Sequence, residues 1–361
     1  MKIGILSMQK IHNYGSFLQA LSLKMQMEAR GHEVYFINIE KGRQIVPPVA
    51  SSASVFSVLK KFDRYFLKRI ENYLLSRRMY GIHVSDYTEY LETDKVLPEG
   101  EKFELVIIGS DEVFNATTPS PWGFSSQLFG SISNAKKVVT YAASCGHTDF
   151  GSAQRYGIVD ELAEAMSHLS DISVRDENTH TFVKQITGKE ALRHLDPVFI
   201  SDYDSKIVPT TRRKPYLLVY AYVNRISDEK EIAAIRAYAR ENGLETVSVG
   251  TQQRWCDHNL SATGFELLSY VKNAACVVTD TFHGTVFSIK YNKKFAAFVR
   301  ESNRNKLGGL LATFDLSGRA VADPSELGRV MDGSIDFDAV NAKIKEEKNR
   351  SMEYLDKICE G

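Results

Sequence analysis

The chain has 361 residues, of which 43% are hydrophobic and 25% charged, which is the balance of a soluble globular protein long enough for two domains. Lys and Arg together number 45, as do Asp and Glu, so the charge does not favour nucleic acid and we expect no nucleic-acid partner. The four cysteines are scattered and include no CxxC motif, which argues against a zinc site or a disulfide framework. Because the sequence shows no signal peptide and no membrane-spanning apolar run, we expect a cytoplasmic protein.

The chain opens with a strand–loop–helix–strand pattern. Residues 2–7 form an apolar run, residues 17–27 carry apolar residues at helical spacing, and residues 34–39 predict a second strand. The loop after the first strand lacks the glycines of a GxGxxG motif, so it predicts no dinucleotide site. Asn13 and Gly15 in this loop either line a pocket for an acceptor or belong to a tight loop that needs glycine.

A long basic helix is predicted over residues 55–79. Its apolar residues form one stripe, and its Lys and Arg residues lie elsewhere on the helix. One interpretation is contact with an anionic or lipid-linked substrate, which would bring the protein into peripheral contact with a membrane-bound acceptor. The other is a docked surface helix whose charges are solvated.

Two predicted strands end in residues that suit a binding site. Residues 103–108 form a buried strand that leads into Asp111, and an acid at the end of a parallel strand points into the crevice at the sheet edge. Asp111 is therefore a candidate catalytic or hydroxyl-binding residue. A short strand over 171–174 runs into Arg175, whose planar fork suits a carboxylate or a phosphate. The alternative for Arg175 is a local ion pair with one of the two acids that follow it.

The second part of the chain repeats the strand–helix alternation. Residues 201–215 are hydrophilic and contain two prolines, which predicts an interdomain linker. Residues 336–361 predict a terminal amphipathic helix. The fold class is therefore α/β, with two Rossmann-like domains, residues 1–200 and 216–335, that face a cleft. The strands expected in the second domain cover residues 216–222, 245–249, 276–278 and 295–298.

The segment 276–290 (CVVTDTFHGTVFSIK) carries the most specific feature of the second domain. An apolar strand is followed by the turn Phe282-His283-Gly284 and then by a helix-like run. The turn delivers an imidazole to the carboxyl end of a strand, and the N–H groups that open the next helix form an anion site. His283 is either a proton donor or phosphate contact, or a residue that caps the helix and packs.

Several pieces of the sequence occur in a distinctive order. They are Asn13-Tyr14-Gly15 with Leu18-Gln19-Ala20, Gly109-Ser110-Asp111, Ser173-Val174-Arg175, Asp196-Pro197, and residues 280–285. Together they resemble the polysaccharide pyruvyl transferase family, and the likeness runs from near the first residue to about residue 349. The resemblance implies a GT-B-like fold and the transfer of a pyruvyl group from phosphoenolpyruvate onto a sugar, which forms a ketal. We expect the reaction to need no metal and no organic cofactor.

The same resemblance suggests roles for the candidate residues. It places phosphoenolpyruvate beside His283 in the second, donor-side domain, with Arg175 as a further contact and with Gly284 and Thr285 at the helix start. The acceptor, a sugar or a lipid-linked glycan, belongs to the first domain. This chemistry needs a general acid, a base near the acceptor and cations for the carboxylate and phosphate. We expect His283 to be the acid or leaving-group contact, and Asp111 the base or anchor for the acceptor.

One position departs from the family pattern. Family members often carry Arg two residues before this His, whereas here the residue is Thr281. Either Arg304 or Lys306 supplies the missing charge, or the donor or the activity differs. The alternative for Arg304 is a surface pair with Glu301.

Two other functions fit the same sequence. The first is a GT-B glycosyltransferase that uses a nucleotide sugar, because a fold does not fix a function. The second is a non-catalytic homologue that binds a glycan, which Thr281 keeps open.

Overall fold

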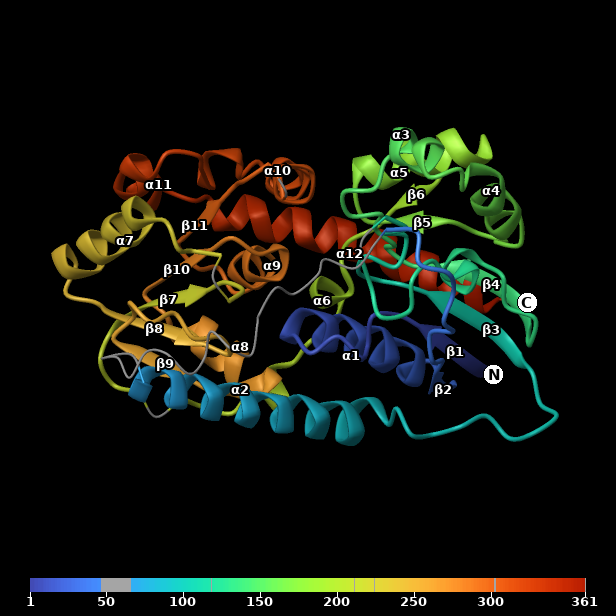
Figure 1. The fold of residues 1–361 in the computed structure, drawn as a ribbon, viewed down its shortest axis with the longest axis horizontal. Helices are drawn as coiled ribbons and strands as arrows, with labels where there is room; N and C mark the ends of the chain where they lie inside the picture. Colours follow the sequence, from blue (N-terminus) through green and yellow to red (C-terminus); the bar gives the residue numbers. More distant parts are fainter. Residues whose placement is uncertain (47–65, 118, 211, 224, 302, 361) are drawn as a thin grey trace.

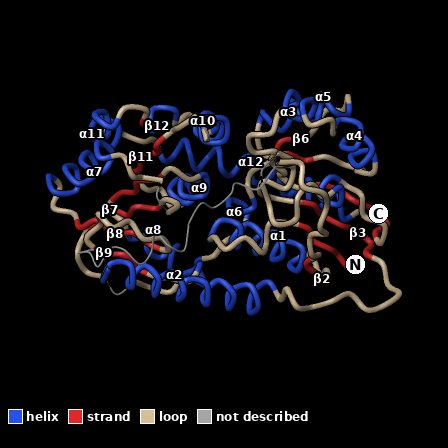
Figure 2. Tube along the Cα trace, viewed as in Figure 1, coloured by secondary structure: helices blue, strands red, loops and turns tan. Residues whose placement is uncertain are grey.

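Two parallel β-sheets flanked by helices make up the structure, a computed structural model (Figures 1 and 2). It describes residues 1–46, 66–117, 119–210, 212–223, 225–301 and 303–360. We call the part built on the first sheet the first half and the part built on the second sheet the second half. The predicted α/β fold with two Rossmann-like units is confirmed.

The first sheet has the strand order β2-β1-β3-β4, and every neighbouring pair is parallel. The short pair β5–β6 extends it, because Val139 in β4 bridges to Asp171 and Ala143 bridges to Val174. The two central strands, β1 and β3, are buried on both faces, which explains why they read as continuous apolar runs. In chain order they are β1 (Lys2–Leu6), β2 (Glu33–Phe36), β3 (Phe103–Ile108), β4 (Ala135–Thr140), β5 (Ser173–Val174) and β6 (Leu192–Arg193).

The helices of the first half differ from the expected ones mainly at their ends. The first helix begins at Tyr14 rather than at residue 17, because the Asn13 side chain accepts a hydrogen bond from the Ser16 N–H at 2.8 Å and caps it. Of the basic helix expected over 55–79, the part up to residue 65 lies outside the described residues. The helices are α1 (Tyr14–Ala29), α2 (Phe66–Asp86), α3 (Phe150–Arg155), α4 (Val159–Ser167), α5 (Glu177–Thr187) and α6 (Pro197–Ile200).

The second sheet has the order β12-β11-β10-β7-β8-β9 and is also parallel throughout. This is the doubly wound order in which the direction of winding reverses between β7 and β10. Its strands are β7 (Tyr216–Tyr220), β8 (Glu245–Val249), β9 (His258–Leu260), β10 (Cys276–Thr279), β11 (Phe295–Phe298) and β12 (Ala320–Val321). Its helices are α7 (Glu229–Glu241), α8 (Gly264–Asn273), α9 (Phe282–Lys290), α10 (Arg304–Thr313) and α11 (Leu327–Asp332).

The last helix, α12 (Phe337–Cys359), returns from the second half to the first (Figure 1). The Tyr354 hydroxyl donates to the Thr140 carbonyl at 2.8 Å, and the Lys137 ammonium donates to the Ile358 carbonyl at 3.1 Å. Both chain ends therefore lie on the first half (Figure 1). The second sheet begins at Tyr216 and the last helix at Phe337, and the domain limits at residues 201, 216 and 336 stay predictions.

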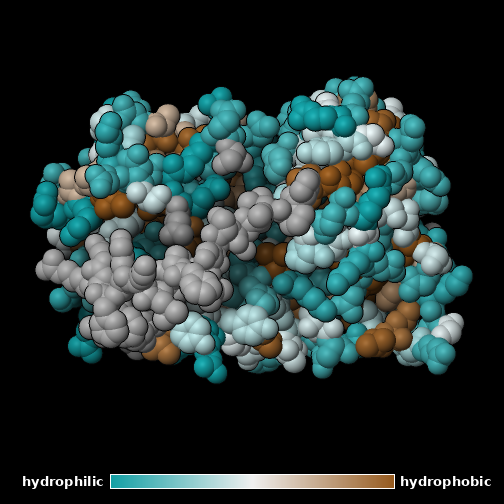
Figure 3. Space-filling view, in the orientation of Figure 1, coloured by the Kyte–Doolittle hydropathy of each residue, from teal (hydrophilic) through white to brown (hydrophobic). Residues whose placement is uncertain are grey.

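One buried apolar cluster passes through both halves and holds them together. It includes Ile5 of β1, Leu218 of β7, Phe287 of α9 and Leu355 of α12. Burial of such side chains stabilises a fold by about 1.5–3 kcal/mol each, so the halves are packed against each other rather than merely tethered. On the face drawn in Figure 3, hydrophilic residues predominate and apolar residues form small scattered patches. Within the described ranges, no helix has both the length and the apolar character needed to cross a membrane.

Candidate active site

The candidate site lies where the carboxyl ends of both sheets meet between the halves. Ligands of open α/β sheets bind at this edge, at the point where the strand order reverses. That point lies between β1 and β3 in the first sheet and between β7 and β10 in the second. Asp111 follows β3 and His283 follows β10, so both predicted catalytic residues lie at a reversal point.

A hydrogen-bonded network positions the Asp111 carboxylate in the first half. The Asn13 amide donates to the Ser16 hydroxyl oxygen at 3.0 Å, and the Ser16 hydroxyl donates to Asp111 Oδ2 at 2.6 Å. Asp111 has a φ of 70°, a left-handed conformation that is costly for a non-glycine residue and is often found at functional sites. The structure thus brings together Asn13 and Asp111, and it adds Ser16, which the sequence analysis did not single out.

Thr281 has a structural role at the start of α9. Its hydroxyl oxygen accepts from the Gly284 N–H at 2.9 Å, so Thr281 is the N-cap, a position at which Thr is favoured. A Cβ on Gly284 would lie 2.2 Å from Thr279 Oγ1, which explains the glycine. The Thr285 hydroxyl donates to the Thr281 carbonyl at 3.1 Å. The hydroxyl groups of Thr281 and Thr285 thus bond to the backbone of the helix start and shape it.

The His283 ring is buried between the two halves. A Cβ on Gly15 would lie 2.0 Å from His283 Nδ1, so the ring lies directly against the start of α1. On its other side, Nε2 is 3.4 Å from Asp196 Oδ2 and makes no hydrogen bond within the described part of the chain. The need for glycine at position 15 therefore comes from close contact with the imidazole.

Asp196 links His283 to Arg175. Arg175 donates from Nη1 to Asp196 Oδ2 at 2.8 Å, and the two side chains are only 3% and 1% exposed. Burial opposes ionisation of Asp196, but His283 and Arg175 outweigh it and lower the Asp196 pKa to about 2. The Arg175 guanidinium also lies 4.0 Å from the centre of the Phe282 ring. The ion-pair partner of Arg175 is thus Asp196, 21 residues later in the sequence, rather than one of the two acids that directly follow Arg175.

The two cations predicted after β11 have different surroundings. Lys306 forms an ion pair with Glu112 of the first half. Burial alone would raise the Glu112 pKa, but the nearby Lys306 charge more than offsets this and lowers it. Arg304 is 67% exposed and pairs with Glu301 at 3.1 Å, as the surface alternative expects. The structure brings Lys306 to the site but does not bring Arg304 there.

A cavity of about 600 Å³ opens beside the Arg175–Asp196 pair, between α5, α10 and α12. Phe282 of α9 and Lys306 of α10 also line it, so residues of both halves border this cavity.

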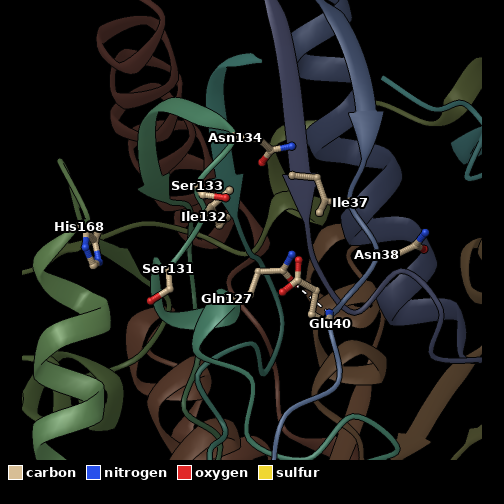
Figure 4. A pocket seen from close by; sticks show the side chains of 9 residues that line it. All are labelled: Ile37, Asn38, Glu40, Gln127, Ser131, Ile132, Ser133, Asn134 and His168. Atoms are coloured by element: carbon tan, nitrogen blue, oxygen red, sulfur yellow. Dashed lines mark hydrogen bonds between the residues drawn. The ribbon is translucent and has the colours of Figure 1, made fainter. Parts of the chain in front are cut away.

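A separate cavity of about 560 Å³ belongs entirely to the first half (Figure 4). The Glu40 N–H donates there to Gln127 Oε1 at 3.0 Å. None of the residues predicted from the sequence borders this cavity. Its lining consists of Ile37, Asn38, Glu40, Gln127, Ser131, Ile132, Ser133, Asn134 and His168.

Three charged residues at the site were not predicted. Asp196 was noted only as part of an Asp-Pro pair. Asp280, fully buried at the end of β10, accepts from Arg225 Nε at 2.9 Å. The signal for Asp280 was present, because an acid just beyond the end of an apolar strand is the pattern that identified Asp111. No comparable signal marks Arg225, which lies in the loop after β7.

Comparisons with known proteins identify the family and the fold. The model of the family "Polysaccharide pyruvyl transferase" matches residues 13–302. Among solved structures, the glycosyltransferase VinC in complex with dTDP has a TM-score of 0.50 at 10% identity, covering 99% of this chain and 98% of that one. LpCGTa in complex with UDP has the same score and identity, covering 100% and 99%. At this identity the likeness shows the fold alone, and it confirms the GT-B-like arrangement. No curated protein matches the sequence.

Proposed function

Because the chain belongs to the polysaccharide pyruvyl transferase family, we propose that this enzyme moves a pyruvyl group from phosphoenolpyruvate onto a sugar of a cell-surface polysaccharide or its precursor. The observation that carries the proposal is the position of His283. It lies at the reversal point of the second sheet, against Gly15 of the first half and 3.4 Å from Asp196. An imidazole there can serve both substrates at once.

The reaction uses two hydroxyl groups of the acceptor. A proton added to the methylene carbon of the enolpyruvyl group makes the neighbouring carbon electrophilic, and the first sugar hydroxyl attacks it. The carbon–oxygen bond to phosphate then breaks, and the second hydroxyl closes the ketal. One hydroxyl proton balances the new methyl group, and the other leaves with inorganic phosphate.

The residues at the site can supply each need of this reaction. We assign His283 as the general acid or the contact for the leaving phosphate, with Asp196 orienting its ring. Asp111, which Ser16 holds by a 2.6 Å hydrogen bond, is the base or anchor for the acceptor. Arg175 supplies positive charge that is fixed at physiological pH, because guanidinium does not deprotonate. Asn13 and Gly15 lie on the acceptor side of the same space.

Lys306, Arg304 and the helix start at Gly284 and Thr285 remain proposed contacts of the donor. Lys306 is supported by its place between the two halves, where it pairs with Glu112 of the first half. Arg304 has no support beyond its position in the sequence, because it is exposed. Thr281 is proposed to contribute through the geometry of the α9 start.

We also propose that the acceptor is reached at an anionic membrane surface, through α2. Tyr73 and Tyr80 are exposed on this helix, and Arg77 and Arg78 are exposed between them. No Asp or Glu occurs in residues 73–85, so charge complementarity favours anionic lipid. Sedimentation with vesicles containing phosphatidylglycerol, but not with phosphatidylcholine alone, is the expected result. The double change Arg77→Gln/Arg78→Gln should abolish the difference.

A cytoplasmic location is part of the same proposal. The structure leaves all four cysteines as free thiols, namely Cys145, Cys256, Cys276 and Cys359, which supports a reducing compartment.

The decisive experiment measures phosphate release from phosphoenolpyruvate with a panel of sugar acceptors. Phosphoenolpyruvate should also raise the melting temperature, because a ligand that binds only the folded state stabilises it. The absence of both effects at millimolar ligand, with or without acceptor, would contradict the proposal. Stabilisation by a nucleoside diphosphate sugar alone would favour a glycosyltransferase, and stabilisation by a glycan alone would favour a non-catalytic homologue.

A further inference from the structure

The crevice between β7 and β10 contains an arginine that no pattern in the sequence marked. Arg225 lies in the loop after β7, and Asp280 directly follows the neighbouring strand β10. Arg225 donates from Nε to Asp280 Oδ2 at 2.9 Å. Two strands on either side of a reversal point thus contribute one charged pair to the crevice in which this kind of sheet binds ligands.

The position of Arg225 is fixed at its backbone as well as at its side chain. Arg300 donates from Nη2 to the Arg225 carbonyl at 2.9 Å and forms a two-pronged pair with Glu231 at 2.7 and 2.9 Å. The Asn303 amide donates to the Asp280 carbonyl at 2.9 Å. The loop after β7 and the end of β10 are therefore tied together.

The pair also leaves polar atoms without partners. Asp280 is fully buried, yet its Oδ1 makes no hydrogen bond within the described ranges. Arg225 is about one-third exposed, and only its Nε has a side-chain partner in the part of the chain that the structure describes. The two terminal nitrogens of its fork, the geometry that suits a carboxylate or phosphate, are thus available to a ligand.

The loop that carries Arg225 begins beside the first half. It follows β7, whose last residue, Tyr220, lies against the start of α1, with the ring centres of Tyr220 and Tyr14 6.2 Å apart.

The other cations near the site are more fully committed to protein partners. Arg175 is buried against Asp196, and Lys306 is paired with Glu112. Arg304 lies on the surface. A trianionic donor brought into this space needs a cation that has free donor groups, because an unpaired buried anion is costly.

We propose that Arg225, seated by Asp280 and Arg300, binds the phosphate or carboxylate group of the anionic donor. This inference rests on the proposed function and gives it a specific residue. It also offers a source of positive charge other than Arg304 at a site where Thr281 is a helix cap.

The test compares phosphoenolpyruvate binding by titration calorimetry in the wild type and in Arg225→Gln. Binding should weaken by at least about 30-fold, the ratio that corresponds to about 2 kcal/mol for loss of one partner of a buried charge pair. Arg329→Gln is the control, because Arg329 also forms an ion pair, with Glu326, but lies exposed on α11. It should bind as the wild type does.

The double variant Arg225→Gln/Asp280→Asn separates binding from folding. Arg225→Gln alone leaves the buried Asp280 carboxylate with only the more distant Arg300, whose Nε lies 3.6 Å from Oδ2, and can lower stability. The double variant also removes the Asp280 charge. Recovered melting temperature with donor binding still weakened by about 30-fold supports the inference. Recovered donor binding overturns it, because the cation was then needed only to neutralise Asp280.

Two ligands identify the group that Arg225 binds. Inorganic phosphate and pyruvate are titrated separately, and the one whose affinity falls in the double variant carries the contact. Unchanged affinity for phosphoenolpyruvate, phosphate and pyruvate, in a wild type that binds and turns over the donor, overturns the inference alone. A wild type that neither binds phosphoenolpyruvate nor releases phosphate overturns the proposed function and this inference together.

Discussion

The two reversal points of this molecule share an architecture and differ in chemistry. At the first, after β1 and β3, the side chains of Asn13, Ser16 and Asp111 bond to one another. At the second, after β7 and β10, the charged groups are incompletely partnered, and Asp280 Oδ1 and His283 Nε2 lack hydrogen bonds within the described ranges. A preorganised amide, hydroxyl and carboxylate suit the hydroxyl groups of a sugar. Ionisable groups that lack hydrogen-bond partners suit an ionic ligand.

This difference indicates how two copies of one fold in a chain can each bind one substrate of a two-substrate reaction. Each half offers the same sheet edge, and only a few loop residues decide which ligand it takes. Asp196 joins the two chemistries, because it contacts Arg175 of the first half and His283 of the second. Changes on either side of this link should therefore have separable effects.

The largest effect is expected from Asp196→Asn, which removes the negative charge between Arg175 and His283. The change leaves the Arg175 charge buried without its partner, which costs about 3–5 kcal/mol of unfolding free energy. Because folding lowers the Asp196 pKa to about 2 from 3.8, its ionic contribution is present above pH 3.8 and is lost as the pH falls through that interval. Urea unfolding of both proteins should show a difference that shrinks in acid.

Asp176→Asn is the control for this experiment. Asp176 caps α5 by accepting from the Thr179 N–H at 2.9 Å, and Asn caps a helix about as well as Asp. A destabilisation equal to that of Asp196→Asn, or one that does not change with pH, would show that the link contributes no buried ion pair.

A change confined to the first reversal point should leave the second intact. Asp111→Asn keeps the left-handed backbone, which Asn tolerates, but removes the negative charge. We expect turnover to fall by about 100-fold or more while phosphoenolpyruvate affinity stays the same. Steady-state kinetics and donor titration measure the two quantities. Parallel losses of stability and activity would instead identify Asp111 as a structural residue.

The contact between the halves is tested by Gly15→Ala. Its new Cβ would lie 2.0 Å from His283 Nδ1, so the ring or α1 must move, at a cost of about 1–3 kcal/mol for overpacking. We expect lower stability and lower turnover together. Gly328→Ala in α11 is the control, because its added Cβ meets nothing within 4 Å beyond its chain neighbours and the backbone of its own helix. If Gly15→Ala behaves like this control, the ring is not held against α1.

The smallest effect is expected from Arg304→Ala. An exposed pair such as Arg304–Glu301 contributes under about 1 kcal/mol, so donor affinity should change by less than about fivefold. The corresponding change between the two halves, Lys306→Ala, should weaken donor binding more than Arg304→Ala does. Calorimetric titration of both variants gives the comparison, and a reversed order would return Arg304 to the donor site.

Much of the fold could be predicted because buried parallel strands leave a plain signal. The strands at Phe103–Ile108, Glu245–Val249 and Phe295–Phe298 have the limits expected from their apolar runs. Helix ends were harder, since the cap at Asn13 decides where α1 begins. That cap depends on one side-chain hydrogen bond rather than on periodicity.

The site was predictable only where a residue follows a strong strand. Asp111 and His283 satisfy this rule, whereas the association of Asp196 with His283 depends on how the two halves pack. Thr281 shows the opposite problem. The sequence suggested a missing charge there, but Thr is also a favoured N-cap, and the structure gives it that role.

The return of α12 to the first half sets a rule for building hybrids between relatives. A hybrid spliced once, near residue 215, would place a foreign terminal helix on the native first sheet and replace the partners of Thr140 and Lys137. A hybrid spliced twice, near residues 215 and 336, would keep each sheet with its own covering helices. To transfer donor preference, the segment between about residues 215 and 336 should be exchanged, and α12 should come from the same relative as the first half.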